Sequence, residues 1–131
     1  MKDLFWKEQG MEMANGAEPQ AGSDDNNIVS VQDNKIYFYS EVSRPKILAL
    51  NKSIIRVGNS IKNRSQVLGA TDVPIELHIC SYGGSVFSGF AAVDYILNSQ
   101  APVHSYIDGC AASAATIMSV VAEERFIHRH S

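Results

Sequence analysis

The sequence predicts an α/β fold with a mainly parallel sheet, on two observations. Short runs of β-branched and aromatic residues alternate with stretches whose apolar residues recur at helical spacing, in the order strand, helix, strand, helix, strand, helix, strand. Apolar residues make up 45% of the 131-residue chain and charged residues 19%, a balance that supports a buried core. Because alternation of this kind joins parallel strands by right-handed crossovers, we expect the helices to pack on the sheet.

The first 27 residues are predicted to be a flexible leader. Residues 15–27 contain many turn-forming residues and almost nothing to bury. The folded domain is therefore expected to span residues 28–131. It begins with two short strands, at 28–31 and 35–39, around an Asp33-Asn34 turn.

The first helix is predicted to begin after Ser43, a residue type that caps helix N-termini, with Pro45 in its first turn. Its apolar residues recur at spacings of three, four and seven, and a polar loop is expected over 63–74. The residues of this stripe are Ile47, Leu50, Ile54 and Ile61.

The second half of the chain repeats the alternation. A strand is predicted at 75–80, and a helix follows it with apolar residues spaced by four, three and four. Another strand is expected at 102–107, an Asp108-Gly109 turn after it, a third helix from about 111 to 122, and a final strand from 125. The apolar residues of the second helix are Val86, Phe90, Val93 and Leu97.

Composition excludes several classes of function. A net charge of −3 offers no general attraction for nucleic acid or acidic membranes, and no apolar stretch reaches the roughly 20 residues of a membrane span. Two cysteines make no disulfide framework, which favours a reduced, cytoplasmic setting. His78 and His104 are expected to be sheet-face residues, so neither a metal nor a cofactor is predicted.

Two loops are expected where ligands gather in open α/β sheets, at the carboxyl ends of strands. The Gly83-Gly84 pair follows one strand, and Ser113, flanked by small residues, follows the next. Each loop alone has a structural explanation, as a tight turn or as close helix packing. If their strands are neighbours, the backbone N–H groups of Gly84 and Ala114 converge near the Ser113 hydroxyl, which is the geometry of acyl transfer.

These residues resemble the ClpP peptidases, the proteolytic subunits of ATP-dependent Clp proteases, whose motifs read approximately S-P-G-G-S/x-V and G-x-A-A-S-M-G-A. The matching segments are Ser81-Tyr82-Gly83-Gly84-Ser85-Val86 and Gly109-Cys110-Ala111-Ala112-Ser113-Ala114-Ala115. The resemblance covers about residues 34–131 and implies a ClpP/crotonase-like fold of repeated β-β-α units. Two departures are minor, since Tyr82 replaces proline and Ala114-Ala115 replace Met-Gly.

The resemblance implies a serine endopeptidase. Ser113 would be the nucleophile, Gly84 and Ala114 would supply the oxyanion N–H groups, and Val86 would line the edge that binds an extended peptide. Peptides or unfolded proteins would be the substrates. A homo-oligomeric ring and an ATP-dependent unfoldase would be the partners.

A third departure concerns the catalytic base. In the family a histidine follows the serine by about two helical lengths and an aspartate lies further on, whereas His128 and His130 come earlier than that. The domain is thus expected to be truncated at its C-terminus, with base and acid beyond Ser131 and the isolated chain inactive. The alternatives are a catalytically degenerate ring subunit and, more remotely, a crotonase-like acyl-CoA enzyme.

Overall fold

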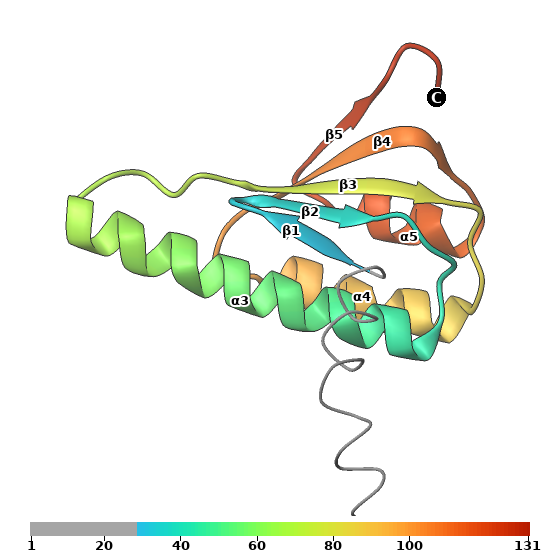
Figure 1. The fold of residues 1–131 in the computed structure, drawn as a ribbon, viewed down its shortest axis with the longest axis horizontal. Helices are drawn as coiled ribbons and strands as arrows, with labels where there is room; N and C mark the ends of the chain where they lie inside the picture. Colours follow the sequence, from blue (N-terminus) through green and yellow to red (C-terminus); the bar gives the residue numbers. More distant parts are fainter. Residues whose placement is uncertain (1–28) are drawn as a thin grey trace, which may run out of the picture.

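The computed structural model describes residues 29–131, and the leader expected at 1–27 lies outside the described residues. The described chain forms one five-stranded sheet in the order β1-β2-β3-β4-β5, with three helices between the parallel strands (Figure 1). The elements are β1 Ser30–Gln32, β2 Lys35–Phe38, α3 Arg44–Leu68, β3 Ile75–Ser81, α4 Val86–Leu97, β4 Val103–Ala111, α5 Ala114–Val120 and β5 Glu124–Ile127.

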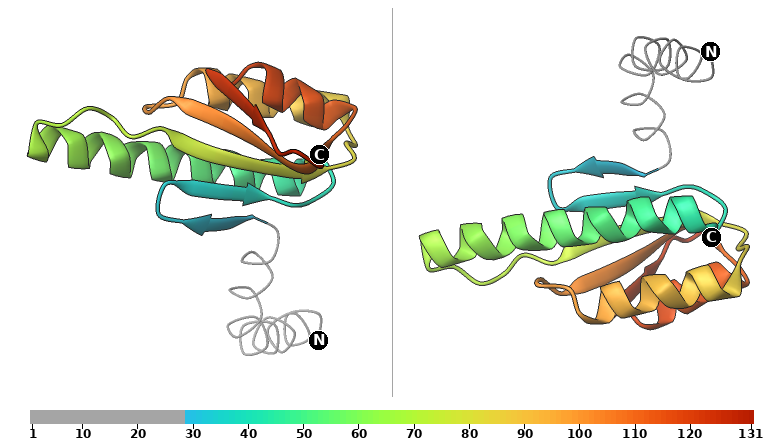
Figure 2. Two further views of the ribbon diagram at one scale, coloured as in Figure 1. Left: turned by 90° about the horizontal axis from the view of Figure 1, so that it is seen from above. Right: turned by 90° about the horizontal axis from the view of Figure 1, so that it is seen from below.

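The fold is of the predicted α/β class, and its sheet is mainly parallel. Strand β1 pairs with β2 in antiparallel fashion around the predicted turn, and the pairs β2–β3, β3–β4 and β4–β5 are parallel. The views of Figure 1 and Figure 2 show all three helices on the same face of the sheet. Because successive strands lie side by side, right-handed crossovers place every helix on one face and leave the other face open.

The core lies between the sheet and these helices. Alternate residues of β2 and β3, such as Phe38 and Leu77, point into it and are fully buried. The apolar stripe of the first predicted helix is confirmed, because its four members are all buried in α3. Those four are Ile47, Leu50, Ile54 and Ile61.

Helix α3 is longer than the sequence predicts. It continues to Leu68 through the segment expected to be a loop, and it ends at Gly69 in the left-handed conformation with φ 61°. Its predicted N-cap residue, Ser43, occupies that position without a side-chain capping bond. Asn63, Arg64 and Gln66 are exposed on this last part of α3 and Ser65 is buried, so a polar sequence alone did not locate the end of the helix.

Strand β4 also extends further than predicted. It includes Asp108 and Gly109, which were expected to form a turn, and α5 begins only at Ala114. The register explains the difference, since Ile79 pairs with Ile107 whereas Ser81 pairs with Ala111. Strand β4 therefore accommodates two extra residues as a bulge, with Gly109 at φ 92°.

Helix α4 buries a different face from its apolar stripe. The buried residues are small ones, Ser88, Gly89 and Ala92, together with Ile96. A Cβ atom at Gly89 would lie 3.2 Å from the Ala114 carbonyl oxygen, so only small residues permit the approach of α4 to α5. Of the four apolar residues that predict the helix, Val86, Phe90 and Leu97 are exposed and Val93 is half-buried; Phe87 beside them is exposed as well.

No helix within residues 29–131 combines the length and the apolar character needed to cross a membrane.

Candidate active site

The two glycine- and serine-bearing loops meet at the carboxyl ends of β3 and β4. A Cβ atom built on Gly83 would lie 2.7 Å from the Ser113 Cβ and 2.8 Å from the Ala112 carbonyl oxygen. Ala112 N–H also donates to the Ser81 carbonyl at 3.0 Å, which ties the two loops together. The two loops are therefore in contact, and this contact requires glycine at position 83.

Ser113 presents its side chain from an unusual backbone conformation. It has φ 53° and ψ −125°, and it is exposed at the N-cap position of α5. A non-glycine residue with positive φ is strained, and such strain is concentrated at functional sites. Its hydroxyl does not cap the helix, so the oxygen is available to another reactant.

Two backbone donors beside this serine are uncommitted. Among the hydrogen bonds within residues 29–131, none uses the N–H of Gly84 or of Ala114. The reason at Gly84 is its bridge to Val42, in which Val42 N–H donates to the Gly83 carbonyl and Ser85 N–H donates to the Val42 carbonyl, each at 2.8 Å. This bridge fixes the loop while leaving the Gly84 N–H free.

The approach of Gly84 to Val42 admits no side chain. With φ 148°, a Cβ atom at Gly84 would lie 2.3 Å from the Val42 carbonyl oxygen. The buried Ser81 side chain holds Gly83 in place, because the Gly83 N–H donates to the Ser81 hydroxyl at 3.2 Å. The glycine pair thus serves close backbone approach at both positions.

The two histidines that follow Ser113 in the sequence are engaged elsewhere or exposed. His128 Nε2 lies 2.9 Å from Asp108 Oδ1, and His130 is on the surface. Within residues 29–131, no hydrogen bond joins the Ser113 hydroxyl to a histidine. The structure therefore brings the serine and the two loops together but pairs neither histidine with it.

Comparison with known proteins identifies the family. The sequence profile described as Clp protease matches residues 31–131. This chain belongs to the Clp protease family. A search of curated proteins found no match.

Solved structures show the same fold. ClpP1 from Listeria monocytogenes superposes on this Clp family chain with a TM-score of 0.59 at 22% identity, over 70% of this chain and 48% of that one. The ClpP protease catalytic domain from Plasmodium falciparum gives a TM-score of 0.56 at 20% identity, over 66% of this chain and 44% of that one. The chain spans about half the length of these structures.

A polar cluster on the open face of this Clp family domain was missed by sequence reasoning. Asp108 accepts a hydrogen bond from the Tyr39 hydroxyl at 2.6 Å and lies 2.8 Å from His78 Nδ1. Burial opposes ionisation, but the Tyr39 and His78 hydrogen bonds outweigh it and hold the pKa of Asp108 below its ordinary value. The same hydrogen bond, with a smaller contribution from burial, raises the pKa of Tyr39 to about 12.

Proposed function

We propose that this domain is the nucleophile-bearing part of a serine-type endopeptidase. The observation that carries the proposal is the contact between the two loops, with Gly83 packed against Ser113 and two free backbone donors beside it. Acyl transfer requires a nucleophile and oxyanion donors about 3 Å from one carbonyl group. Membership of the Clp protease family supports the same chemistry.

In the proposed mechanism, the Ser113 oxygen attacks the carbonyl carbon of a peptide bond. The carbonyl oxygen becomes negative and accepts hydrogen bonds from the N–H groups of Gly84 and Ala114. The serine proton passes to a base and then to the leaving amine, which departs as the acyl-enzyme forms. Water subsequently releases the acid and restores the serine hydroxyl.

The proposed base and its orienting acid come from residues other than 29–131. The described histidines do not contact the Ser113 hydroxyl. The solved relatives are about twice as long as the stretch they share with this chain. We therefore expect a histidine- and aspartate-bearing segment of the family to complete the site, and residues 1–131 alone to be nearly inactive.

The proposed substrates are peptides or unfolded proteins bound in extended form along the edge that begins at Val86. This residue is the second after Gly84 and the first of α4, and it is 47% exposed. An extended peptide there would lie beside the carbonyl-binding N–H groups. An ATP-dependent unfoldase is the proposed partner that delivers such substrates.

A homo-oligomeric ring is the proposed assembly. Helix α4 leaves large apolar side chains on its outer surface, with Phe87 at 86% and Phe90 at 52% exposure. An exposed apolar surface of this kind is typical of a protein–protein interface. The two cysteines are free, which supports a cytoplasmic location for the assembly.

The test uses two forms of the protein. One is the chain of residues 1–131, and the other carries a family segment that supplies histidine and aspartate after residue 131. A fluorophosphonate probe is expected to label Ser113 in the completed form only. Ser113→Ala should abolish labelling, and Ser60→Ala, at an exposed serine of α3, should leave it unchanged. Labelling that survives Ser113→Ala, or rapid peptide turnover by the short chain, would overturn the proposal.

A second candidate function is a catalytically degenerate ring subunit. It is favoured by one observation, that no described histidine contacts the Ser113 hydroxyl. In that case the chain would co-assemble with an active subunit, and Ser113→Ala would leave the peptidase activity of the mixed ring unchanged. A proportional loss of activity would favour the first candidate.

A further inference from the structure

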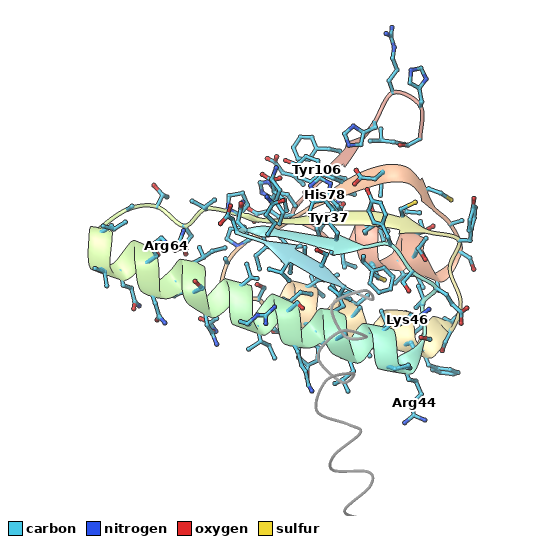
Figure 3. All side chains as sticks on the ribbon, in the orientation of Figure 1. Tyr37, Arg44, Lys46, Arg64, His78 and Tyr106 are labelled. Carbon is cyan, nitrogen blue, oxygen red and sulfur yellow. The ribbon has the colours of Figure 1, made fainter. Side chains whose placement is uncertain are left out.

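The open face of the sheet carries a ladder of stacked rings. Tyr37, His78, Tyr106 and Phe126 occupy matching register positions on four adjacent strands. The His78 ring lies between the two tyrosines, with ring centroids at 4.8 Å and 4.9 Å (Figure 3). The imidazole is therefore held in one plane by its neighbours before any ligand arrives.

Three potential metal ligands meet beside this ladder. His78 from β3, Asp108 from β4 and His128, which follows β5, each offer one atom, and the three atoms lie within 4.8 Å of one another. The cluster joins side chains that are 50 positions apart in the sequence. His78 is the middle residue of β3, Asp108 lies within β4, and His128 directly follows the end of β5.

One carboxylate oxygen of the cluster is buried without a hydrogen bond, which is an environment that a cation could occupy. Asp108 Oδ1 is buried and lies 2.9 Å from His128 Nε2, yet the pair lacks hydrogen-bond geometry and the oxygen has no hydrogen bond within residues 29–131. A buried polar atom of this kind calls for an unseen partner such as an ion or a water.

Neighbouring residues contact the ligands and would orient them for a metal ion. The Tyr39 hydroxyl donates to Asp108 Oδ2 at 2.6 Å and fixes the carboxylate. Glu76 Oε2 faces His78 Nε2 at 3.6 Å. On metal binding, the proton that Nδ1 shares with Asp108 would leave, Nδ1 would bind the ion, and a proton on Nε2 would point toward the Glu76 carboxylate.

We propose that His78, Asp108 and His128 form a binding site for a divalent transition-metal ion, with Zn²⁺ as the expected occupant. Imidazole nitrogen and carboxylate oxygen are ordinary zinc ligands, and three protein ligands leave a fourth position for water. Ligand atoms on one tetrahedral zinc lie about 3.3 Å apart, so the largest spacing must shrink by at most about 1.5 Å. His128 is 63% exposed on its side chain and lies on a turn, so it is the ligand free to move.

The bound ion would join the edge strand to the centre of the sheet. Strand β5 is exposed along its whole length, and the segment after it contacts β4 through the Ser131 hydroxyl, which donates to the Ile107 carbonyl at 2.9 Å. An ion bound by His128, Asp108 and His78 together would strengthen that attachment. This site stands on residues other than Ser113, and it rests on no part of the proposed function.

The test is calorimetric titration of the chain, free of any affinity tag, with zinc chloride. We expect one Zn²⁺ per chain and a rise in the melting temperature with zinc. His128→Gln should weaken binding by at least about tenfold. His130→Gln is the matched control, since it replaces an exposed histidine of the same turn outside the cluster, and it should leave the affinity unchanged.

A second variant guards against loss of folding. Asp108→Asn keeps the side-chain volume and an oxygen that accepts the Tyr39 hydrogen bond, while it removes the charge that attracts the ion. It should also weaken zinc binding at least about tenfold with an unchanged circular dichroism spectrum. The proposal is overturned if the wild-type chain takes up no zinc, or if His128→Gln and His130→Gln bind it equally well.

Discussion

Replacement of Gly83 by alanine perturbs the contact on which the proposed site depends. The new Cβ atom would lie 2.7 Å from the Ser113 Cβ, whereas carbon atoms in contact prefer about 3.5–4.0 Å. One of the two loops must therefore move by about 1 Å. Gly83 also has φ 103°, a conformation that alanine adopts only under strain.

Two contributions set the expected loss of stability. Backbone strain costs about 1–3 kcal/mol, and forcing a methyl group into the packed contact costs a further 1–3 kcal/mol or so. The free energy of unfolding should thus fall by about 2–6 kcal/mol. In the completed form, displacement of the nucleophile by about 1 Å should slow fluorophosphonate labelling about 100-fold.

Gly69→Ala provides the matched control. Gly69 also has positive φ, at 61°, but a Cβ atom there meets nothing within 4 Å. Urea denaturation followed by circular dichroism should show Gly83→Ala to be less stable than Gly69→Ala by about 1–3 kcal/mol, the packing contribution. Equal destabilisation of the two variants would refute the contact between the loops.

Three further predictions concern the stability of the domain. Met118→Ala removes a fully buried side chain of α5 and should lower the free energy of unfolding by about 2–5 kcal/mol in urea denaturation. Ser81→Ala leaves the buried N–H of Gly83 without its hydrogen bond and should cost about 1–3 kcal/mol in the same assay. The hydrogen bond from Ser65 lowers the pKa of Asp72, so Asp72 adds stability above its unfolded-state pKa and loses it as pH falls through the lowered value. The stability of wild type relative to Asp72→Asn should decline over that acidic range, and a difference that stays constant with pH would contradict the assignment.

The order of elements and the core of α3 were predictable because local periodicity determines them. Ile47 and Leu50 recur at helical spacing and are buried by the sheet as expected. Helix α4 shows where this reasoning fails. Its neighbours lie so close that residue size decides the buried face, so Gly89 is inside and Phe90 is half-exposed.

The candidate site was predictable in one part and not in another. Local motifs indicated that the Gly83 and Ser113 loops meet, and the structure has that contact. The strained backbone of Ser113 carries no signal in the sequence. Asp108 was expected in a turn because Asp-Gly is a common turn dipeptide, whereas β4 is paired on both sides up to Ile107 and continues through a bulge that keeps Asp108 beside His78.

The central claim is that the free backbone donors of Gly84 and Ala114 bind the negative oxygen that forms when the Ser113 hydroxyl attacks a carbonyl group. A crystal structure of the completed protein after reaction with a fluorophosphonate tests this most directly. We predict phosphorus bonded to the Ser113 oxygen and a phosphonyl oxygen within about 2.7–3.1 Å of both backbone nitrogens. An adduct on another residue, or a phosphonyl oxygen turned toward water and away from both nitrogens, would contradict the claim.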